Sequence, residues 1–526
     1  MVNAILRPAY DANDLPKAMY RFLAKILLTI GSISSIAFGN GQQINIINDV
    51  SHHYSFFYAW SNAQNFGGKH GYVDWENNQQ FQQSQATLSS LDLSNYNLFN
   101  LVLDQKHDLP YFEADIETLK SYVNDGGGLF VFPAIAKEGA AENCRKLLKR
   151  FGADISDDLS SAAITADSGE ELDAVSDHHH LIFANPKNWE VLARDAESNP
   201  VVAIRKKGNG HIAVASFSSF VRVSIKGKTL PPGYKFPNYA FAQRLIKRTA
   251  AGKTVTPNEG LMTRWGSQMP TIWPDKVRDM GAFRIRHTDY SAHIVDKVLE
   301  DYKFLYPILE DYMGVPMVSG SAEGEKFTID LLAVAGSGVS RGKQIGIAMF
   351  KENFYGILGH ELTHSWVVPH PEPLSNEGIA IHVGSTVSYA ASKLKRDKKH
   401  MDFHQNALAW RIKGALEDPQ FDEWDPAIPQ DTSKYSKTLM FGKYIHLIAE
   451  LKKNYGADVN ARYFRMKRKY VPAEDYRFTT HDSVWLWSQA TGEDQFPFFN
   501  KAGISIDRSK VRIPGANSLD SRVFRR

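Results

Sequence analysis

Short apolar segments alternate with amphipathic ones along the first half of the chain. The apolar segments of strand length lie at residues 44–50, 98–103, 128–132 and 211–217, and helical patterns lie between them. This alternation is typical of an α/β layer with parallel strands. We therefore predict an α/β fold for residues 42–252.

The second half has a different pattern, which starts after a linker predicted near residues 252–260. Residues 291–313 show helical periodicity, and strand patterns follow at residues 327–334 and 345–350. Further helical patterns occupy most of the remaining sequence. We predict a mainly helical α+β domain over residues 260–526.

A short segment within this second half carries three side chains suited to metal chemistry. Apolar residues recur at helical spacing from Leu358 to Trp366, so His360 and His364 lie one turn apart on the same helix face. Both imidazoles can therefore reach one Zn²⁺, and Glu361 beside them can take a proton from metal-bound water. The pattern predicts a peptidase whose cofactor is Zn²⁺.

The residues after His364 offer three possible third metal ligands: His370, Glu372 and Glu377. His370 has the spacing of the metzincin pattern HExxHxxGxxH, but this chain has Val367 where that pattern has a turn-forming glycine. Glu377 starts a second helical pattern, and a chain that doubles back from the first helix can present this carboxylate to the metal. We favour Glu377, with a metzincin-like endopeptidase that uses His370 as the alternative.

The two helical segments resemble the gluzincin metallopeptidases, most closely the aminopeptidase N-like branch. Residues 360–366, HELTHSW, are similar to the HExxHxW motif of that branch, and residues 376–380, NEGIA, to its NEGxA motif. The resemblance implies a peptide or protein substrate and Glu361 as the general base. The zinc ligands that it implies are His360, His364 and Glu377. Only twelve residues separate the second histidine from the ligand glutamate, fewer than in the family, so the connecting loop must be short.

The same family uses a downstream tyrosine to stabilise the oxyanion, in a Tyr-x-Lys-Gly context. Residues 435–438, YSKT, keep the tyrosine and the lysine, so the resemblance implies Tyr435, with Tyr444 as the second choice. The family's GAMEN strand, which holds the free amino terminus of a substrate, has no clean copy in residues 346–353. We expect a strand there to form the cleft edge that pairs with an extended peptide, and exopeptidase specificity is not supported.

Residues 115–132 resemble the helix, glycine turn and strand of the class I glutamine amidotransferase-like fold, which has a flavodoxin-like parallel sheet. The nucleophilic cysteine of those enzymes has no equivalent after the strand, and Cys144 falls on the apolar face of a predicted helix. We therefore expect a non-catalytic domain that contacts a cell-surface glycan or peptide. The competing hypothesis is a protein that only binds such ligands and has a relic peptidase domain.

Histidines cluster at residues 52–53 and 178–180, and adjacent imidazoles can bind a metal. Neighbours i and i+1 point in different directions on a helix or a strand, so a site would need partners that the sequence does not identify. We expect no metal at either cluster. We interpret the glutamine-rich residues 79–85 as a solvated helix or loop.

The composition narrows the function classes further. The chain has 526 residues, 43% of them hydrophobic, which is enough for two or three cores. Its net charge is +3 and its lysines and arginines are dispersed, so nucleic-acid binding is not expected. The single cysteine excludes an intramolecular disulfide. Nothing in the sequence sets an oligomeric state.

The amino terminus has the design of a signal peptide. From Met19 a short basic stretch precedes the apolar residues 26–36, and residues 37–39, AFG, resemble a cleavage site. We predict that translation starts at Met19 and that residues 1–41 comprise an upstream extension and the signal peptide. The protein is then periplasmic or secreted, with an uncleaved membrane anchor as the alternative.

Overall fold

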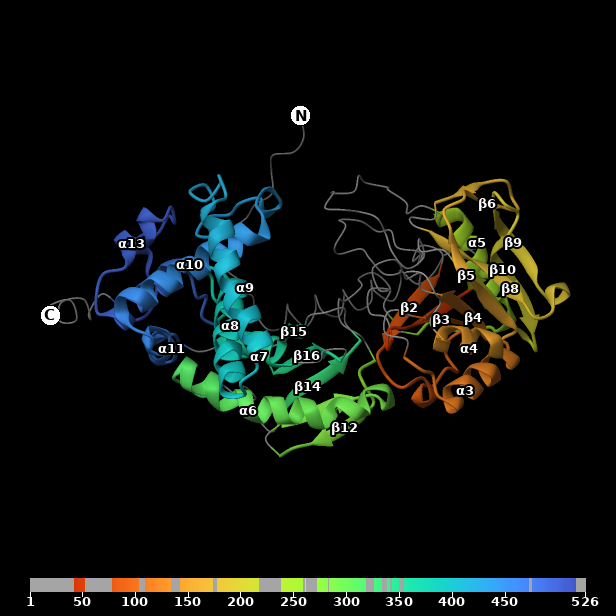
Figure 1. Cartoon of the computed structure of the whole chain (residues 1–526), viewed down its shortest axis with the longest axis horizontal. Helices are drawn as coiled ribbons and strands as arrows, with labels where there is room; N and C mark the ends of the chain where they lie inside the picture. Colours follow the sequence, from red (N-terminus) through yellow and green to blue (C-terminus); the bar gives the residue numbers. More distant parts are fainter. Residues whose placement is uncertain are drawn as a thin grey trace, which may run out of the picture.

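Figure 1 shows the computed structural model of the chain. The structure describes residues 42–52, 78–103, 109–133, 142–173, 177–216, 238–258, 261, 272–281, 283–317, 326–333, 338–340, 343–349, 354–472 and 475–516. The predicted signal peptide within residues 1–41, including the start at Met19, lies outside these described residues. Within them, none of the helices has both the length and the apolar character of a membrane span.

The N-terminal domain is built on a nine-stranded mixed sheet with the order β2-β1-β3-β4-β11-β10-β9-β6-β7. The strands from β2 to β11 are parallel, and the others are antiparallel to their neighbours. The parallel strands are β1 (Ile44–Asp49), β2 (Gln79–Ser84), β3 (Leu98–Leu103), β4 (Gly128–Pro133) and β11 (Gly210–Ala215). The others are β6 (Ile164–Ala166), β7 (Glu171–Leu172), β9 (Glu190–Asp195) and β10 (Pro200–Lys207). A separate antiparallel pair joins β5 (Ala153–Ser160) to β8 (His178–Phe183).

Helices cover both faces of the parallel strands. The domain contains α3 (Glu113–Asn124), α4 (Glu142–Arg150) and α5 (Tyr239–Thr249). In β4, Leu129 and Val131 belong to the core that contains α3 and α4, whereas Phe130 and Phe132 belong to the core that contains α5. Successive side chains alternate across a strand, so a continuous apolar run fits burial on both faces. The predicted α/β fold is confirmed, and Cys144 is buried on α4 as expected.

One strand of this sheet contradicts the sequence interpretation. Residues 79–84 are not a solvated helix or loop but form the buried edge strand β2, which runs parallel to β1. Gln79 is almost fully buried, and its side-chain amide donates a hydrogen bond to Gln243 of α5 at 2.6 Å. A glutamine amide can be buried when it finds such a partner. Because this strand consists mostly of polar residues, the hydrophobic pattern of the sequence does not indicate it.

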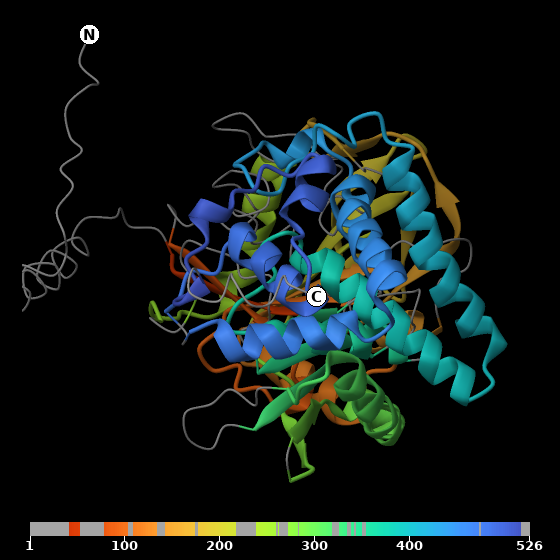
Figure 2. The same cartoon turned by 90° about the vertical axis from the view of Figure 1, so that its left-hand side faces the viewer.

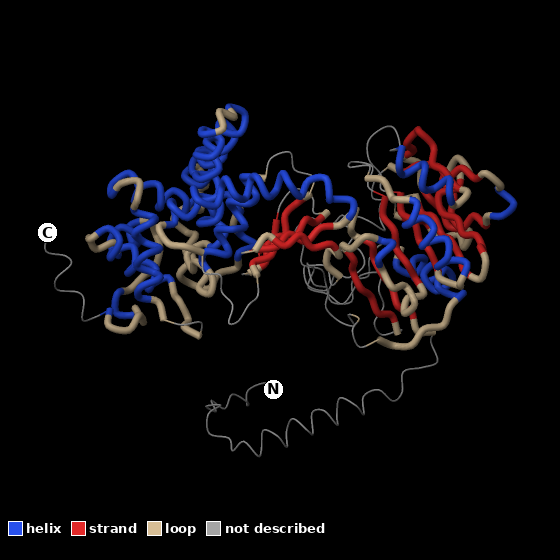
Figure 3. The backbone as a smooth tube through the Cα atoms, turned by 90° about the horizontal axis from the view of Figure 1, so that it is seen from below, coloured by secondary structure: helices blue, strands red, loops and turns tan. Residues whose placement is uncertain are grey.

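The C-terminal region is mainly helical and contains a five-stranded sheet with the order β12-β13-β14-β16-β15 (Figure 3). The strands are β12 (Lys276–Asp279), β13 (Phe283–His287), β14 (Phe327–Leu332), β15 (Gly338–Ser340) and β16 (Gln344–Ala348). The helices are α6 (Val295–Met313), α7 (Tyr355–Val367), α8 (Asn376–Leu394), α9 (Lys398–Leu416), α10 (Lys437–Tyr455), α11 (Val459–Tyr470), α12 (Thr480–Thr491) and α13 (Phe496–Lys501). One core contains buried residues from β13, β14 and β16 and from most of these helices. The prediction of a mainly helical α+β region is confirmed.

The edge of this small sheet differs from the expectation. The strand predicted at residues 345–350 is β16, but β16 is an inner strand, because β15 pairs with it in antiparallel register. The edge strand is therefore β15.

The two parts of the chain meet through buried polar contacts. The Leu88 N–H donates to the Tyr290 hydroxyl oxygen at 3.0 Å, and that hydroxyl donates to the Asp115 carboxylate at 3.0 Å. Ser84, at the end of β2, forms a parallel bridge with Ile272. Figure 2 shows the helical C-terminal region in front of the N-terminal domain. The domain boundaries 42–252 and 260–526 stay a prediction.

Candidate metal centre

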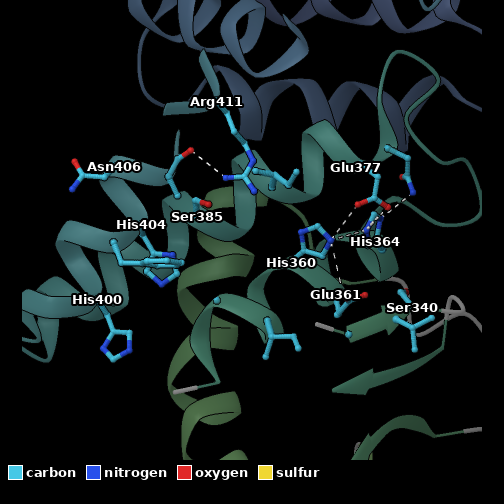
Figure 4. A pocket seen from close by; sticks show the side chains of 18 of the residues that line it. Ser340, His360, Glu361, His364, Glu377, Ser385, His400, His404, Asn406 and Arg411 are labelled. Atoms are coloured by element: carbon cyan, nitrogen blue, oxygen red, sulfur yellow. Dashed lines mark hydrogen bonds and ion pairs between the residues drawn. The ribbon is translucent and has the colours of Figure 1, made fainter. Parts of the chain in front are cut away.

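The two motif histidines project from one face of α7. Leu358 and Leu362 are fully buried and hold the opposite side of this helix in the core. His360 Nε2 and His364 Nε2 lie 3.2 Å apart (Figure 4). The helix ends at Val367, before an extended residue that precedes Pro369, as expected for a residue that proline keeps out of the helical region. The predicted placement of both imidazoles on one helix face is confirmed.

Glu377 reaches the same point from α8. This helix begins with a capping interaction, in which Ser375 Oγ accepts a hydrogen bond from the Gly378 N–H at 3.0 Å. Glu377 Oε2 lies 3.5 Å from His360 Nε2, and Glu377 Oε1 lies 3.4 Å from His364 Nε2. The structure therefore brings together the three side chains that the motif resemblance implies as ligands.

The spacing of these three groups fits the donor set of a zinc ion. Ligand atoms about 2.0–2.1 Å from Zn²⁺ in a tetrahedral arrangement lie roughly 3.3 Å from one another. The corresponding separations here are 3.2, 3.4 and 3.5 Å. Two imidazoles and a carboxylate also leave a fourth position for water or substrate, as catalytic zinc sites do.

Helices α7 and α8 approach closely at two glycines, and this approach sets the distance between Glu377 and the two histidines. A Cβ atom on Gly384 of α8 would lie 2.8 Å from the backbone nitrogen of His360, and one on Gly359 of α7 would lie 3.2 Å from the Gly384 Cα. The two helix backbones are thus in direct contact, which only residues without side chains allow. Glu377 lies about two helical turns before this crossing, where it reaches both histidines.

Asn376 holds the ring of His364. Its amide nitrogen lies 2.9 Å from His364 Nδ1, while its amide oxygen is buried and has no hydrogen-bond partner among the described residues. A half-turn of the amide exchanges the two atoms, so that the oxygen accepts a hydrogen bond from Nδ1–H. This arrangement satisfies the oxygen and leaves the lone pair of Nε2 free for a metal, as ligand histidines require.

Glu361 has the environment of a general base. Its side chain is 5% exposed, and its Oε1 lies 4.0 Å from His360 Nε2. Burial raises the pKa of Glu361 to about 7, which the neighbouring His360 opposes and the Glu377 carboxylate reinforces. Glu361 also belongs to a metal-compatible group with the two histidines, but Glu377 lies closer to both rings. The distances therefore favour Glu377 over Glu361 as the third side chain of a metal site with the two histidines.

The electrostatics of the other members suit metal binding. Burial lowers the pKa of His364, which favours the neutral form of the imidazole that binds metals. A hydrogen bond from His360 lowers the pKa of Glu377, which keeps that carboxylate ionised.

The site opens into a cavity of about 1330 Å³ between α7, α8, α9 and β15. The edge strand contributes Gly338, Val339 and Ser340 to the wall. The polar side chains of α9 that line the cavity are Lys399, His400, Asp402, His404, Asn406 and Arg411, four of which are labelled in Figure 4. The sequence analysis missed these α9 residues, because they follow no recognised motif and only the packing of α9 on α8 brings them to the site.

The two tyrosines considered for the oxyanion lie elsewhere. Tyr435 follows a 3₁₀ turn and packs against Trp424, with ring centroids 4.9 Å apart. Tyr444 is 2% exposed, and its ring lies beneath Gly378 in the first turn of α8. Neither residue lines the cavity. The catalytic role of Tyr435 stays a prediction that the geometry does not support.

The other possible third ligands have different partners. His370 is buried and its Nε2 lies 3.0 Å from the carbonyl oxygen of Pro472. Glu372 is also buried, and it accepts a hydrogen bond from Ser483 at 2.6 Å and another from Tyr463. Both side chains therefore have structural partners, and the geometry favours Glu377 over them.

Comparisons with known proteins find only distant likenesses. No family model and no curated protein sequence matches the chain. A two-domain M1 zinc metallopeptidase bound to L-tryptophan aligns with a TM-score of 0.32 and 12% identity over 46% of this chain and 52% of that chain. A putative ThuA-like protein from Parabacteroides merdae has a TM-score of 0.23 and 12% identity over 44% and 96%. An exo-β-1,4-mannosidase from an Opitutaceae bacterium has a TM-score of 0.23 and 14% identity over 34% and 32%.

The chain thus spans about half of the peptidase and a third of the mannosidase. Likenesses this distant identify neither a function nor site residues for this chain.

Proposed function

We propose that the chain is an exported zinc-dependent peptidase that hydrolyses peptide bonds. The observation that carries this proposal is the convergence of His360, His364 and Glu377, with separations of 3.2–3.5 Å, beside the buried carboxylate of Glu361. Zinc, when bound by these three side chains, supplies a Lewis acid that polarises the scissile carbonyl and lowers the pKa of water.

Glu361 performs the proton transfers in this proposal. Its pKa of about 7 lies near neutral pH, so the carboxylate can take a proton from the attacking water and return it to the leaving amine. Gly338 of β15 packs against Glu361, since a Cβ atom there would lie 2.6 Å from Glu361 Cγ. The edge strand therefore fixes the base from one side.

The same edge strand offers a place for the substrate backbone. β15 is the last strand of its sheet, and all three of its residues line the cavity. An extended peptide can add to such an edge through main-chain hydrogen bonds. This mode requires no free amino terminus, which favours an endopeptidase.

Replacing Glu361 by glutamine tests the role of the base. The amide keeps the size of the side chain but cannot accept the proton, so turnover should fall by about 10²- to 10⁴-fold, while zinc content stays unchanged. Cleavage of a peptide library is followed by mass spectrometry, with zinc measured on the same samples. Glu417→Gln, an exposed acid at the end of α9, serves as the matched control. Full activity of the Glu361 variant would refute the assignment.

The competing hypothesis is a non-catalytic binding protein with a relic peptidase domain. In a domain that no longer catalyses a reaction, the base or a metal ligand is commonly replaced. In this chain all four side chains are present and converge. Export through the signal peptide from Met19, and contact of the N-terminal domain with a cell-surface glycan or peptide, remain parts of the proposal. The amino-terminal residue and mass of the mature protein test the first of these.

A further inference from the structure

A second group of metal-compatible side chains lies in the N-terminal domain. His178 and His180 are two residues apart on β8, so their side chains share one face of the strand. Asp195, the last residue of β9, meets them there. His180 Nε2 lies 2.8 Å and His178 Nε2 lies 3.7 Å from Asp195 Oδ2, and the donor atoms of all three lie within 4.8 Å of one another.

This arrangement differs from the sequence-based expectation that the histidine cluster holds no metal. That expectation considered only adjacent residues, whereas on a strand the side chains of residues i and i+2 lie on the same face. The third partner comes from β9 of the nine-stranded sheet, which the sequence pattern does not connect to β8. Figure 1 shows β8 and β9 in the N-terminal domain, well separated from α7 and α8.

His178 lacks ordinary partners for its ring. The residue is fully buried, and neither of its ring nitrogens has a hydrogen-bond partner in the described part of the chain. Burial lowers the pKa of His178, and the neighbouring Asp195 carboxylate opposes this shift. A buried polar group without a partner calls for an explanation, and a bound ion is one of the few available.

Asp195 is held in place for ligation. Its Oδ1 accepts hydrogen bonds from the backbone N–H groups of Glu197 at 3.0 Å and Asn199 at 2.8 Å. Its Oδ2 faces the two histidines and also accepts a hydrogen bond from the Asn199 side-chain amide at 3.2 Å. Desolvation opposes ionisation, but the hydrogen bonds from Asn199 prevail and lower the pKa of Asp195. Carboxylates that bind metals are oriented by outer hydrogen bonds of this kind.

We propose that His178, His180 and Asp195 bind a divalent first-row transition-metal ion, independently of the centre on α7 and α8. Two imidazoles and one carboxylate suit zinc, iron or a similar ion better than calcium or magnesium. The side chain of His180 is 21% exposed, so the ion can enter from its side. A simple His180–Asp195 ion pair accounts for one histidine but leaves His178 Nδ1 without a partner among the described residues, and gives His178 Nε2 only the 3.7 Å contact with Asp195 Oδ2.

The position of the site gives the ion a structural role. β8 belongs to the two-stranded sheet with β5, whereas β9 belongs to the nine-stranded sheet. An ion held by both strands cross-links the two sheets, and its binding free energy adds to the stability of the folded domain.

The test uses the full chain with His360→Ala and His364→Ala, which removes the imidazoles of the other centre. The protein is stripped with a chelator and loaded with Zn²⁺ or Co²⁺. We expect about one equivalent of bound metal, a visible Co²⁺ absorption band, and a melting temperature that rises with added Zn²⁺.

Adding Asp195→Asn to this background should abolish the bound metal, the absorption band and the thermal shift. Glu197→Gln, which changes an acid two residues away, should leave all three unchanged. His180→Gln, at a partly exposed position, replaces Asp195→Asn if the latter does not fold. The proposal is overturned if the folded parent of this series binds no metal, or if the ligand variants bind as much as Glu197→Gln. Neither result depends on peptidase activity.

Discussion

The crossing of α7 and α8 at Gly384 makes the most specific prediction about the metal centre. Replacing Gly384 by alanine places a Cβ atom 2.8 Å from the His360 nitrogen and 2.9 Å from its Cα, whereas ordinary contact begins near 3.4 Å. The obstructing atoms are backbone, so they cannot rotate away. The helices must separate by about 0.6 Å, three times the roughly 0.2 Å tolerance of a metal site.

Zinc affinity should therefore fall by about 10- to 100-fold, and overpacking should cost about 1–3 kcal/mol of folding free energy. Helix propensity acts in the opposite direction, because alanine is about 1 kcal/mol better than glycine in a helix. Zinc affinity is measured by competition with a chelator, and folding by circular dichroism.

Gly414→Ala on α9 is the matched control, since its Cβ would meet only a rotatable methyl group of Thr438. A folded Gly384→Ala protein that binds zinc as tightly as the Gly414→Ala protein would refute this reading of the helix crossing.

Three further predictions follow from the same geometry. Gly338→Ala places a Cβ atom 2.7 Å from Glu361 Oε1 and so displaces this carboxylate. In steady-state kinetics, kcat should fall roughly 10- to 100-fold while the zinc content stays unchanged. An unchanged kcat would show that Gly338 does not position Glu361. Burial raises the pKa of Glu361 from 4.5 to about 7. As pH rises, Glu361 therefore loses its proton in the unfolded state before it does so in the folded state. The free energy of unfolding of the zinc-free protein should fall by up to about 3 kcal/mol between pH 4.5 and pH 7. Urea unfolding tests this, and a Glu361→Gln protein with the same pH dependence would exclude Glu361 as its source. Glu377→Gln should lose zinc and His370→Gln should retain it in elemental analysis, whereas the reverse result would restore the metzincin-like alternative.

The arrangement of the candidate metal centre was largely predictable because its residues are close in sequence. His360 and His364 lie within one turn of a helix, and local periodicity fixes their common face. Glu377 required only a short loop between two helical patterns, because twelve residues separate it from His364. The oxyanion tyrosine rested on a partial motif alone, and the structure places Tyr435 away from the cavity.

Features that depend on distant partners were not predictable. The strand β2 is glutamine-rich, and the amide of the buried Gln79 donates a hydrogen bond to Gln243, 164 residues later. The histidine cluster on β8 becomes a metal-compatible site only when β9 supplies Asp195. Tertiary contacts of this kind leave no periodic trace in the sequence, so the hydrophobic pattern assigns such segments to loops or ordinary cores.

Anomalous diffraction from a zinc-loaded crystal, recorded at the zinc absorption edge, shows whether zinc binds between α7 and α8, because it distinguishes the two proposed centres by position. We expect a peak within about 2.2 Å of His360 Nε2, His364 Nε2 and the Glu377 carboxylate. The absence of a peak between α7 and α8 in a zinc-loaded crystal, or a peak there that excludes Glu377, would contradict this expectation.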